Sequence, residues 1–305
     1  MLSYLSKRLG MALLAAFAAS IITFLITNLA VDPAVVIAGG TASNQDIESI
    51  RSLYGFDKNV FLRYLDWVSG ALTGDLGISF RTHRPVFELL IERLPITLTL
   101  GFISLLLAIT IAVPLAVVAA LYPNSWLDRF CLTFAVLGQA LPTFWFGLLM
   151  ILLFSVKLGW LPVSGSSGWK NFVMPSIALG YYAMPALMRM TRTGLLDVLS
   201  ADYIRTARAM GLMPKTVIFK HALRNAVIPV VSLAAVQFGL MLGGSIVIET
   251  IFAIQGIGFL AWIAITQADF PVVQAIVLIV SVIYIFLVLF ADLINAALDP
   301  RIRVV

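Results

Sequence analysis

The chain has 305 residues, of which 61% are hydrophobic and only 11% are charged, and its mean hydropathy is +1.03. A soluble domain carries about 25% charged residues, so this composition predicts an integral membrane protein. The formal net charge of +5 does not indicate a nucleic-acid partner, because the basic residues collect beside apolar segments rather than on a hydrophilic domain. A single cysteine, Cys131, excludes a disulfide framework or a cysteine metal cluster.

Six stretches, each free of Asp, Glu, Lys, Arg and His, approach or exceed the roughly 20 apolar residues that cross a bilayer. They are Leu9–Val31, Leu94–Leu127, Phe130–Val156, Asn171–Met188, Asn225–Ile248 and Phe270–Ala291. The first follows Lys7 and Arg8, as the apolar region of a signal peptide does, but it is too long for such a region and we expect a retained helix. Six helices place both ends of the chain on one side of the membrane.

The distribution of Lys and Arg predicts the orientation, because short cytoplasmic flanks are enriched in both. With the N-terminus inside, most basic residues on the outer side fall in one long segment, 32–93, and long segments are translocated whatever their charge. We therefore expect both termini in the cytoplasm.

The segment 32–93 predicts a small, mostly helical subdomain on the outer face. Apolar residues recur at helical spacing from Ile47 to Tyr54 and again from Phe61 to Val68. The pattern is then broken by three glycines, Gly70, Gly74 and Gly77. This subdomain either caps its own membrane helices or receives an external partner, and both roles are compatible with the pattern.

Between the last two predicted spans, Glu249–Asp269 has a different character. Gly256 and Gly258 precede an apolar stretch that is too short to cross a bilayer. We expect an interfacial or re-entrant helix there.

The uncharged spans restrict the possible mechanisms. Proton-coupled carriers and charge-selective channels usually need ionisable residues at membrane depth, and the six predicted spans have none. The sequence contains no GxxxxGK[ST] phosphate loop, no HExxH motif and only two histidines, His83 and His221. We expect a protein without catalytic residues, metal or cofactor of its own, driven by an external source of energy.

The polar segment 189–224 is the largest interruption of the apolar second half. It carries seven cations, Arg189, Arg192, Arg205, Arg208, Lys215, Lys220 and Arg224, and its charge predicts a cytoplasmic loop. Asp202 favours the start of a helix that runs to Met210, with Gly211 after its end and Pro214 opening a second helix to Asn225. The small residues Ala207 and Gly211 would let a partner approach closely. The simpler alternative is a loop that only sets topology.

The stretch DYIRTARAMGLMPKTVIFKHALRNAVIP, Asp202–Pro229, resembles the cytoplasmic signature of ABC importer permeases, in the form of the dipeptide/oligopeptide permease family. The resemblance covers nearly the whole chain. Further matches are Gly74–Gly77 with Ser79, Leu94–Leu98, Gly243–Glu249 and Leu298–Arg303. Met210 stands where this branch often has Lys, and Gln255 where it often has Pro.

The resemblance implies an all-α type I importer permease with six transmembrane helices in the bacterial inner membrane. Its regions would be 1–31, a first helix; 32–93, the external subdomain; and 94–305, a five-helix core. Implied partners are a homologous permease, two ATPase subunits that bind ATP and Mg²⁺, an extracytoplasmic solute-binding protein and membrane lipid, with no nucleic acid. The residues implied to couple to an ATPase are Asp202, Tyr203, Arg205, Thr206, Ala207, Arg208, Ala209, Met210 and Gly211.

The transport pathway implied by the resemblance lies between this chain and the second permease. Polar or adaptable residues within the spans are its candidate lining, namely Gln139, Thr143, Gln237 and Met241, although each could equally bond another helix. Peptides are the expected substrates, and the same branch also moves glutathione, nickel or other metal chelates, opines or sugars. A self-contained channel or facilitator and a membrane scaffold or sensor are the alternative classes.

Overall fold

The computed structural model describes residues 2–29, 32–39 and 42–298. The regular elements within these ranges are helices, and extended pairing is limited to one bridge between Ile78 and Pro85. In chain order they are α1 (Leu2–Leu29), α2 (Pro33–Ala38), α3 (Asn44–Leu53), α4 (Val60–Thr73), α5 (Val86–Leu121), α6 (Trp126–Ala140), α7 (Thr143–Met150), η1 (Ile151–Lys157), α8 (Trp169–Ser200), α9 (Asp202–Ala209), α10 (Pro214–Thr216), η2 (Val217–Ala222), α11 (Leu223–Ala226), α12 (Ile228–Ile251), α13 (Ile257–Thr266) and α14 (Phe270–Leu298).

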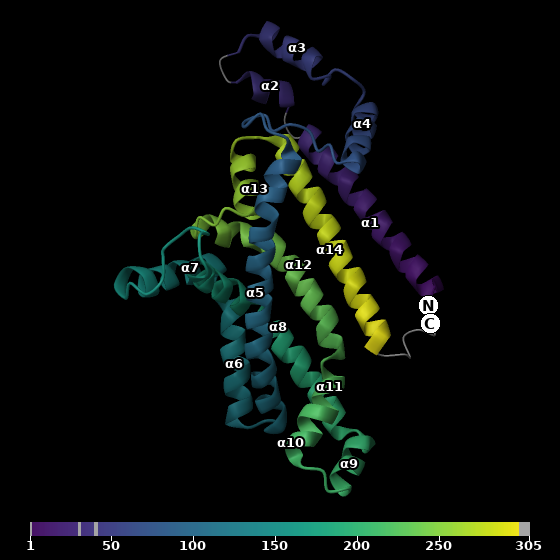
Figure 1. Cartoon of the computed structure of the whole chain (residues 1–305), viewed down its shortest axis with the longest axis vertical. Coiled ribbons are helices and arrows are strands. Elements are labelled where there is room, and N and C mark those ends of the chain that lie inside the picture. The colour runs from purple at the N-terminus through teal and green to yellow at the C-terminus, as the bar shows by residue number, and fades with distance from the viewer. Residues whose placement is uncertain (1, 30–31, 40–41, 299–305) are drawn as a thin grey trace.

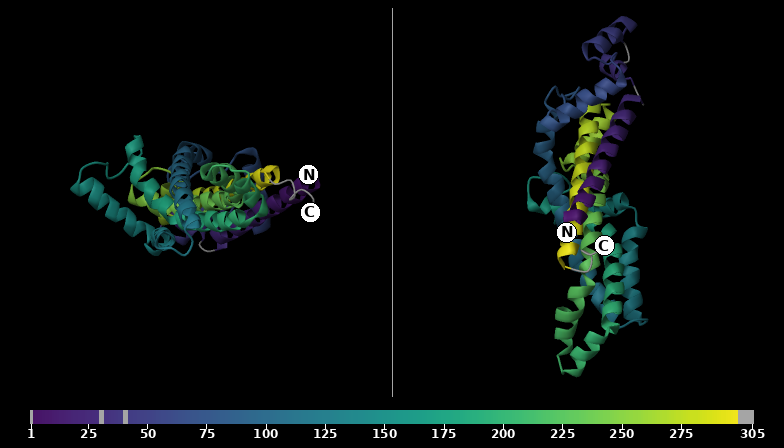
Figure 2. Two further views of the ribbon diagram at one scale, coloured as in Figure 1. Left: turned by 90° about the horizontal axis from the view of Figure 1, so that it is seen from below. Right: turned by 90° about the vertical axis from the view of Figure 1, so that its right-hand side faces the viewer.

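The molecule is elongated, and its long helices run along the long axis (Figure 1). Helices α2, α3 and α4 lie at one end, and the loop formed by α9, α10 and α11 lies at the other. Helices α5 and α8 form the most extensive contact between elements, while α1 packs against α14 along one edge. The right-hand view of Figure 2 also shows the green segment that contains α9 and α10 projecting beyond the other helices.

Small residues allow the central helices to approach closely. A Cβ atom added to Gly180 of α8 would lie 2.5 Å from the carbonyl oxygen of Ser104 in α5, so only glycine fits at this crossing. Gly138 of α6 is in the same situation, because a Cβ atom added to it would clash with the carbonyl oxygen of Tyr181 in α8. Helix association in membranes depends on such close packing, because lipid supplies no hydrophobic driving force between helices.

Among the described residues, four helices are long and apolar enough to cross a membrane, and a bent pair makes a possible fifth, so the predicted count of six is not established. The four segments are Arg8–Thr27, Val86–Leu121, Ile228–Ile251 and Phe270–Ile294. The first overlaps the predicted Leu9–Val31, whose last two residues lie outside the described ranges. The predicted fourth span, Asn171–Met188, falls in α8, where prolines and tyrosines lower the hydropathy. That composition is tolerated because much of α8 is buried between other helices rather than exposed to lipid.

The predicted third span, Phe130–Val156, is not one straight helix. It divides into α6 and the pair α7–η1, which meet at 98°. The break falls at Leu141 and Pro142. Proline has no backbone N–H and disfavours the helical conformation of the residue before it, so the helix ends there.

Two helix boundaries also differ from expectation. Helix α5 begins at Val86, so the charged residues Glu88, Glu92 and Arg93 belong to the same helix as the apolar span. Helix α8 continues past Met188 to Ser200, so the first part of the predicted loop 189–224 is an extension of a long helix. Charged residues end an apolar stretch without ending a helix, because Arg, Glu and Lys are good helix formers.

The external segment contains the two expected helices as α3 and α4. The Ser43 side chain and Asp46 form a reciprocal capping box at the start of α3. Gly70, predicted to break the second helix, lies inside α4, which ends instead at Gly74 in the left-handed conformation. The Tyr64 and Ser20 hydroxyls are 2.8 Å apart, which ties α4 to α1.

The expected short apolar helix between the last two spans is α13. Its start is held by Glu249 of α12, which is fully buried. One carboxylate oxygen accepts from the Thr97 hydroxyl of α5 at 2.7 Å and the other from the Phe259 N–H at 2.9 Å. The Thr97 oxygen in turn accepts the Ile257 N–H at 2.8 Å. This network joins α5, α12 and α13.

Candidate functional site: the loop between α8 and α12

The loop has the helix–turn–helix form expected from its sequence. Helix α9 ends at Ala209 and is followed by Gly211 at φ +76°, whose N–H donates to the Arg208 carbonyl at 3.0 Å. The Leu212 N–H donates to the Ala207 carbonyl at 3.3 Å and closes the turn. The second helix begins at Pro214 and runs through α10, η2 and α11, with a π-helical middle.

A small apolar core holds the two helices of the loop together. Ile204 and Ala207 of α9 pack with Val217 and Ala222 of η2. The same cluster includes Leu195 of α8, Ala226 of α11, and Val117 and Ala120 of α5. The loop is therefore continuous with the central helix pair rather than a loose connection.

The burial of Ala207 corrects one expectation. Its side chain is only 4% exposed and belongs to the core of the loop, so it does not offer a close approach to a partner. Ile204, which was not singled out from the sequence, is completely buried beside it. The three-residue spacing of these two apolar side chains was the available signal.

The other predicted coupling residues are exposed, namely Asp202, Tyr203, Arg205, Thr206, Arg208, Ala209, Met210 and Gly211. The tip of the loop also exposes two large apolar side chains, Met210 at 69% and Met213 at 75%. Flexible, exposed methionines are typical of surfaces that bind other proteins. Arg205 and Asp202 are 3.5 Å apart, but both are too exposed for this pair to add much stability.

A buried ion pair fixes α8 just before the loop. The guanidinium of Arg192 donates two hydrogen bonds to the Asp128 carboxylate of α6, at 2.8 and 2.6 Å. The Asn124 N–H donates to the same carboxylate at 2.9 Å. Asp128 is 3% exposed. This bidentate ion pair fixes the two helices relative to each other, so a movement of α8 would also move the start of α6.

The four predicted lining residues differ in their exposure within this chain. Gln139 is exposed and Thr143 is partly buried, whereas Gln237 and Met241 are buried within the chain. An apolar pocket of about 370 Å³ lies at the bend between α6 and α7, against α5 and α8. Phe134, Phe146 and Tyr181 are among its lining residues. Because segments distant in sequence form it, no local pattern indicates it.

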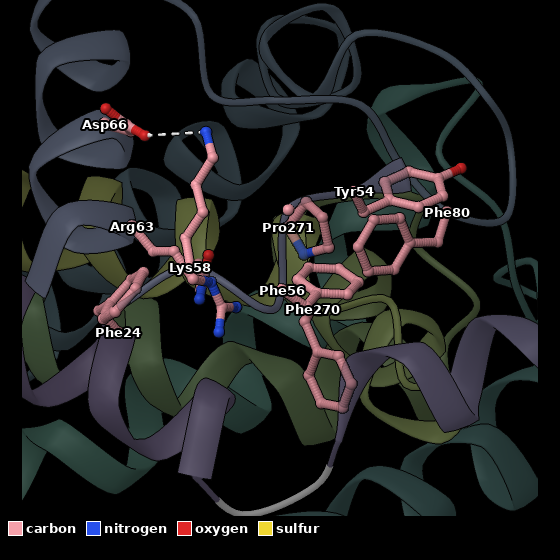
Figure 3. Close-up of a pocket in the computed structure, with 11 residues that line it drawn as sticks. Phe24, Tyr54, Phe56, Lys58, Arg63, Asp66, Phe80, Phe270 and Pro271 are labelled. Atoms are coloured by element: carbon pink, nitrogen blue, oxygen red, sulfur yellow. Dashed lines mark ion pairs between the residues drawn. The ribbon is translucent and has the colours of Figure 1, made fainter. Parts of the chain in front are cut away.

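A second pocket, of about 220 Å³, lies where the external helices meet the bundle (Figure 3). Aromatic side chains line much of it, and the Arg63 guanidinium lies over the Phe56 ring at 5.0 Å. Lys58 and Asp66 face each other at its edge, 4.0 Å apart. Burial lowers the pKa of Arg63, and the charge of Asp32 opposes that shift.

These features define a class of protein: a helical, multi-pass membrane protein whose loop between α8 and α12 is folded, basic and packed onto the central helices. Residues 112–304 match the family model for the binding-protein-dependent transport system inner membrane component. Residues 1–101 match the model for the N-terminal part of such membrane components. The chain therefore belongs to the family of binding-protein-dependent transport system inner membrane components.

Relatives extend over the whole length. The chain is 41% identical over 304 residues to the glutathione transport system permease protein GsiC of Escherichia coli strain CFT073, covering 99% of each protein. It is 40% identical, with the same coverage, to GsiC of Escherichia coli strain K12. An inward-facing structure of the methionine ABC transporter MetNI shares the fold, with a TM-score of 0.58 and 23% identity over 69% of this chain and 96% of that one.

Proposed function

We propose that the chain is the permease of an ATP-driven importer for small peptides of the glutathione class. The family assignment supports an importer permease, and the full-length similarity to glutathione permeases supports this substrate class. The alternative substrates are peptides of other lengths and metal chelates. In this proposal the chain has no catalytic residues, and partner ATPases bind and hydrolyse ATP.

The observation that carries the proposal is the exposed tip of a rigid loop. Met210, Gly211 and Met213 lie between the end of α9 and the start of α10, and these two helices are at the end of the molecule opposite α2–α4 (Figure 1). In the proposed complex this tip binds an ATPase subunit. Closure of the ATPases would push the loop as one body, because its core is continuous with α5 and α8.

The Arg192–Asp128 pair would then carry the displacement from α8 to α6, the helix beside the bend at Pro142. The substrate pathway would open between this chain and a homologous permease. Gln139, Thr143, Gln237 and Met241 remain predicted lining residues. The external helices α2–α4, with the pocket around Phe56 and Arg63, would receive the solute-binding protein on the opposite face.

The test is co-purification of the tagged chain with the permease and ATPase subunits encoded beside it, followed by measurement of ATP hydrolysis and glutathione uptake. Wild type should retain the ATPases. The double variant Met210→Glu/Met213→Glu should capture at least about tenfold less ATPase than wild type, because two carboxylates would enter an apolar contact.

The matched control is Leu72→Glu on α4, which adds a carboxylate at a position 83% exposed on the opposite end. It should capture ATPase as wild type does. A wild-type chain that conducts glutathione without capturing an ATPase would overturn the proposal in favour of a channel. Equal capture by the tip variant and the control would show that Met210 and Met213 are not at the contact.

A further inference from the structure

A polar pocket of about 330 Å³ lies between α9 and the start of α12, separate from the exposed tip of the loop. Its lining residues come from four elements and are Tyr203, Lys220, His221, Arg224, Asn225 and Ile228. The ATPase contact proposed at Met210, Gly211 and Met213 gives no role to this pocket, and only Tyr203 of its lining belongs to the predicted coupling residues.

The chemistry of the lining favours an anion. Its charged residues, Lys220 and Arg224, are both cationic, and His221 adds a third basic group. Within the described part of the chain, none of the three has an acidic group at ion-pair distance, whereas Arg192 and Arg205 do. The two cations, Lys220 and Arg224, repel each other unless an anion lies between them.

The pocket is also partly ordered in advance. The Asn225 amide donates to the Tyr203 hydroxyl at 2.8 Å and, less closely, to the His221 carbonyl at 3.3 Å. These bonds fix Asn225 and the Tyr203 ring across the pocket, and they link α9 to α11. The tyrosine hydroxyl keeps its own hydrogen available as a donor. The lining therefore offers hydrogen-bond donors as well as positive charge.

The pocket lies next to the start of a helix of membrane length, which favours a lipid as the source of the anion. Ile228 is the first residue of α12, an apolar helix of membrane length. Arg224 precedes it by four residues and Lys220 by eight, so both lie close in the chain to the start of this helix. Basic side chains at that depth meet the headgroup layer, where anionic lipids collect.

We propose that this pocket binds a phosphate group presented by the headgroup of an anionic lipid. The phosphate would accept hydrogen bonds from Arg224 and Tyr203 and would compensate the charge of Lys220. Because the pocket joins α9 to α11 and α12, a bound headgroup would brace the loop against the membrane surface. The proposal concerns lipid binding by the chain and does not depend on the identity of the transported substrate.

The experiment measures lipid retained by the purified full-length chain after reconstitution into nanodiscs of phosphatidylcholine with 20% phosphatidylglycerol (about one lipid in five, enough to populate a single headgroup site). Wild type should retain phosphatidylglycerol in excess over its share of the bilayer. Lys220→Gln/Arg224→Gln should weaken that preference about 25-fold, since each basic residue near a membrane surface contributes about fivefold.

The control Arg208→Gln/Lys215→Gln removes two exposed cations of the same loop that do not line the pocket. It should keep the preference. An equal loss in both double variants would overturn the proposal, because only the net charge would then matter. Arg224→Gln alone provides a second measurement, in which the preference for phosphatidylglycerol should fall about fivefold.

Two further arms separate the possible sources of the anion. Stabilisation of the chain by millimolar inorganic phosphate, without enrichment of phosphatidylglycerol, would overturn a lipid source. Binding of an ATPase that displaces phosphatidylglycerol, and that is itself lost in the Lys220→Gln/Arg224→Gln variant, would assign the pocket to an acidic protein side chain instead. Retention of phosphatidylglycerol beside a bound ATPase is the expected result.

Discussion

At the scale of single residues, burial separates groups that look alike in the sequence. Ala207 and Ala209 lie two positions apart on α9, yet the first is buried in the core of the loop and the second is exposed. Met210 and Met213 are exposed, although methionines elsewhere, such as Met184 and Met188, are completely buried. Side chains that support the loop can therefore be distinguished from those available to a partner.

This distinction predicts the effect of a charge on α9. Ala207→Asp should destabilise the protein by about 3 kcal/mol, because it buries a carboxylate with no basic partner in the apolar core. Ala209→Asp, the matched control, should change stability by less than about 0.5 kcal/mol because its side chain faces solvent. Thermal unfolding in detergent and the rate of proteolysis between residues 201 and 226 would measure both. Similar unfolding of the two variants would contradict the packing of α9.

At the scale of elements, a few polar contacts and one proline decide how helices join. Pro142 turns a predicted straight span into two helices that meet at 98°. Glu249 and Thr97 connect α5 and α12 to the start of α13. The Arg192–Asp128 pair connects α8 to α6. Such contacts are costly to break inside the protein, because each leaves a buried polar group unpaired.

The junction at Thr97 provides a test with closely matched variants. Thr97→Val removes a hydroxyl that donates to Glu249 and accepts the Ile257 N–H, and it should cost about 1 to 3 kcal/mol of stability. Thr97→Ser keeps the hydroxyl and loses only a methyl group, so its cost should be less than half as large. Thermal unfolding of the two purified variants gives the comparison. A serine variant as unstable as the valine variant would show that packing, rather than the hydrogen bonds, sets the effect.

At the scale of the whole molecule, the two ends of the elongated bundle differ in chemistry. One end has the helical segment α2–α4, and the other has the folded basic loop (Figure 1). The excess of Lys and Arg in the loop predicts that it faces the cytoplasm and that the external helices face the opposite side. Importers need this asymmetry, because substrate arrives on one side and ATP is hydrolysed on the other.

Cysteine labelling tests this orientation. In a Cys131→Ala background, Leu72→Cys and Met213→Cys each place one exposed thiol at opposite ends of the molecule. In right-side-out spheroplasts, a membrane-impermeant maleimide should label Leu72→Cys and should label Met213→Cys only after permeabilisation. Both variants should react fully in detergent, which serves as the control for accessibility. The reverse pattern would mean that the basic loop lies outside.

Much of the fold could be predicted because a helix that crosses a lipid bilayer needs a continuous run of apolar residues. Apolar length located the helices that became α1, α5, α12 and α14, and Gly211 with Pro214 located the turn of the loop. Helix ends were less accurate, since α5 and α8 continue through charged residues. The broken span was missed, although Pro142 was a local signal that could have indicated it.

The sequence by itself determined the class of protein, the approximate positions of the long helices and the position of the basic loop, because hydropathy and charge act locally along the chain. Only the tertiary structure decided which side of α9 is buried, which acid pairs with Arg192, and that Tyr203 shares a pocket with Lys220 and Arg224. These facts depend on contacts between segments far apart in sequence. Asp128 and Arg192 are 64 residues apart, and no local pattern specifies such a pair.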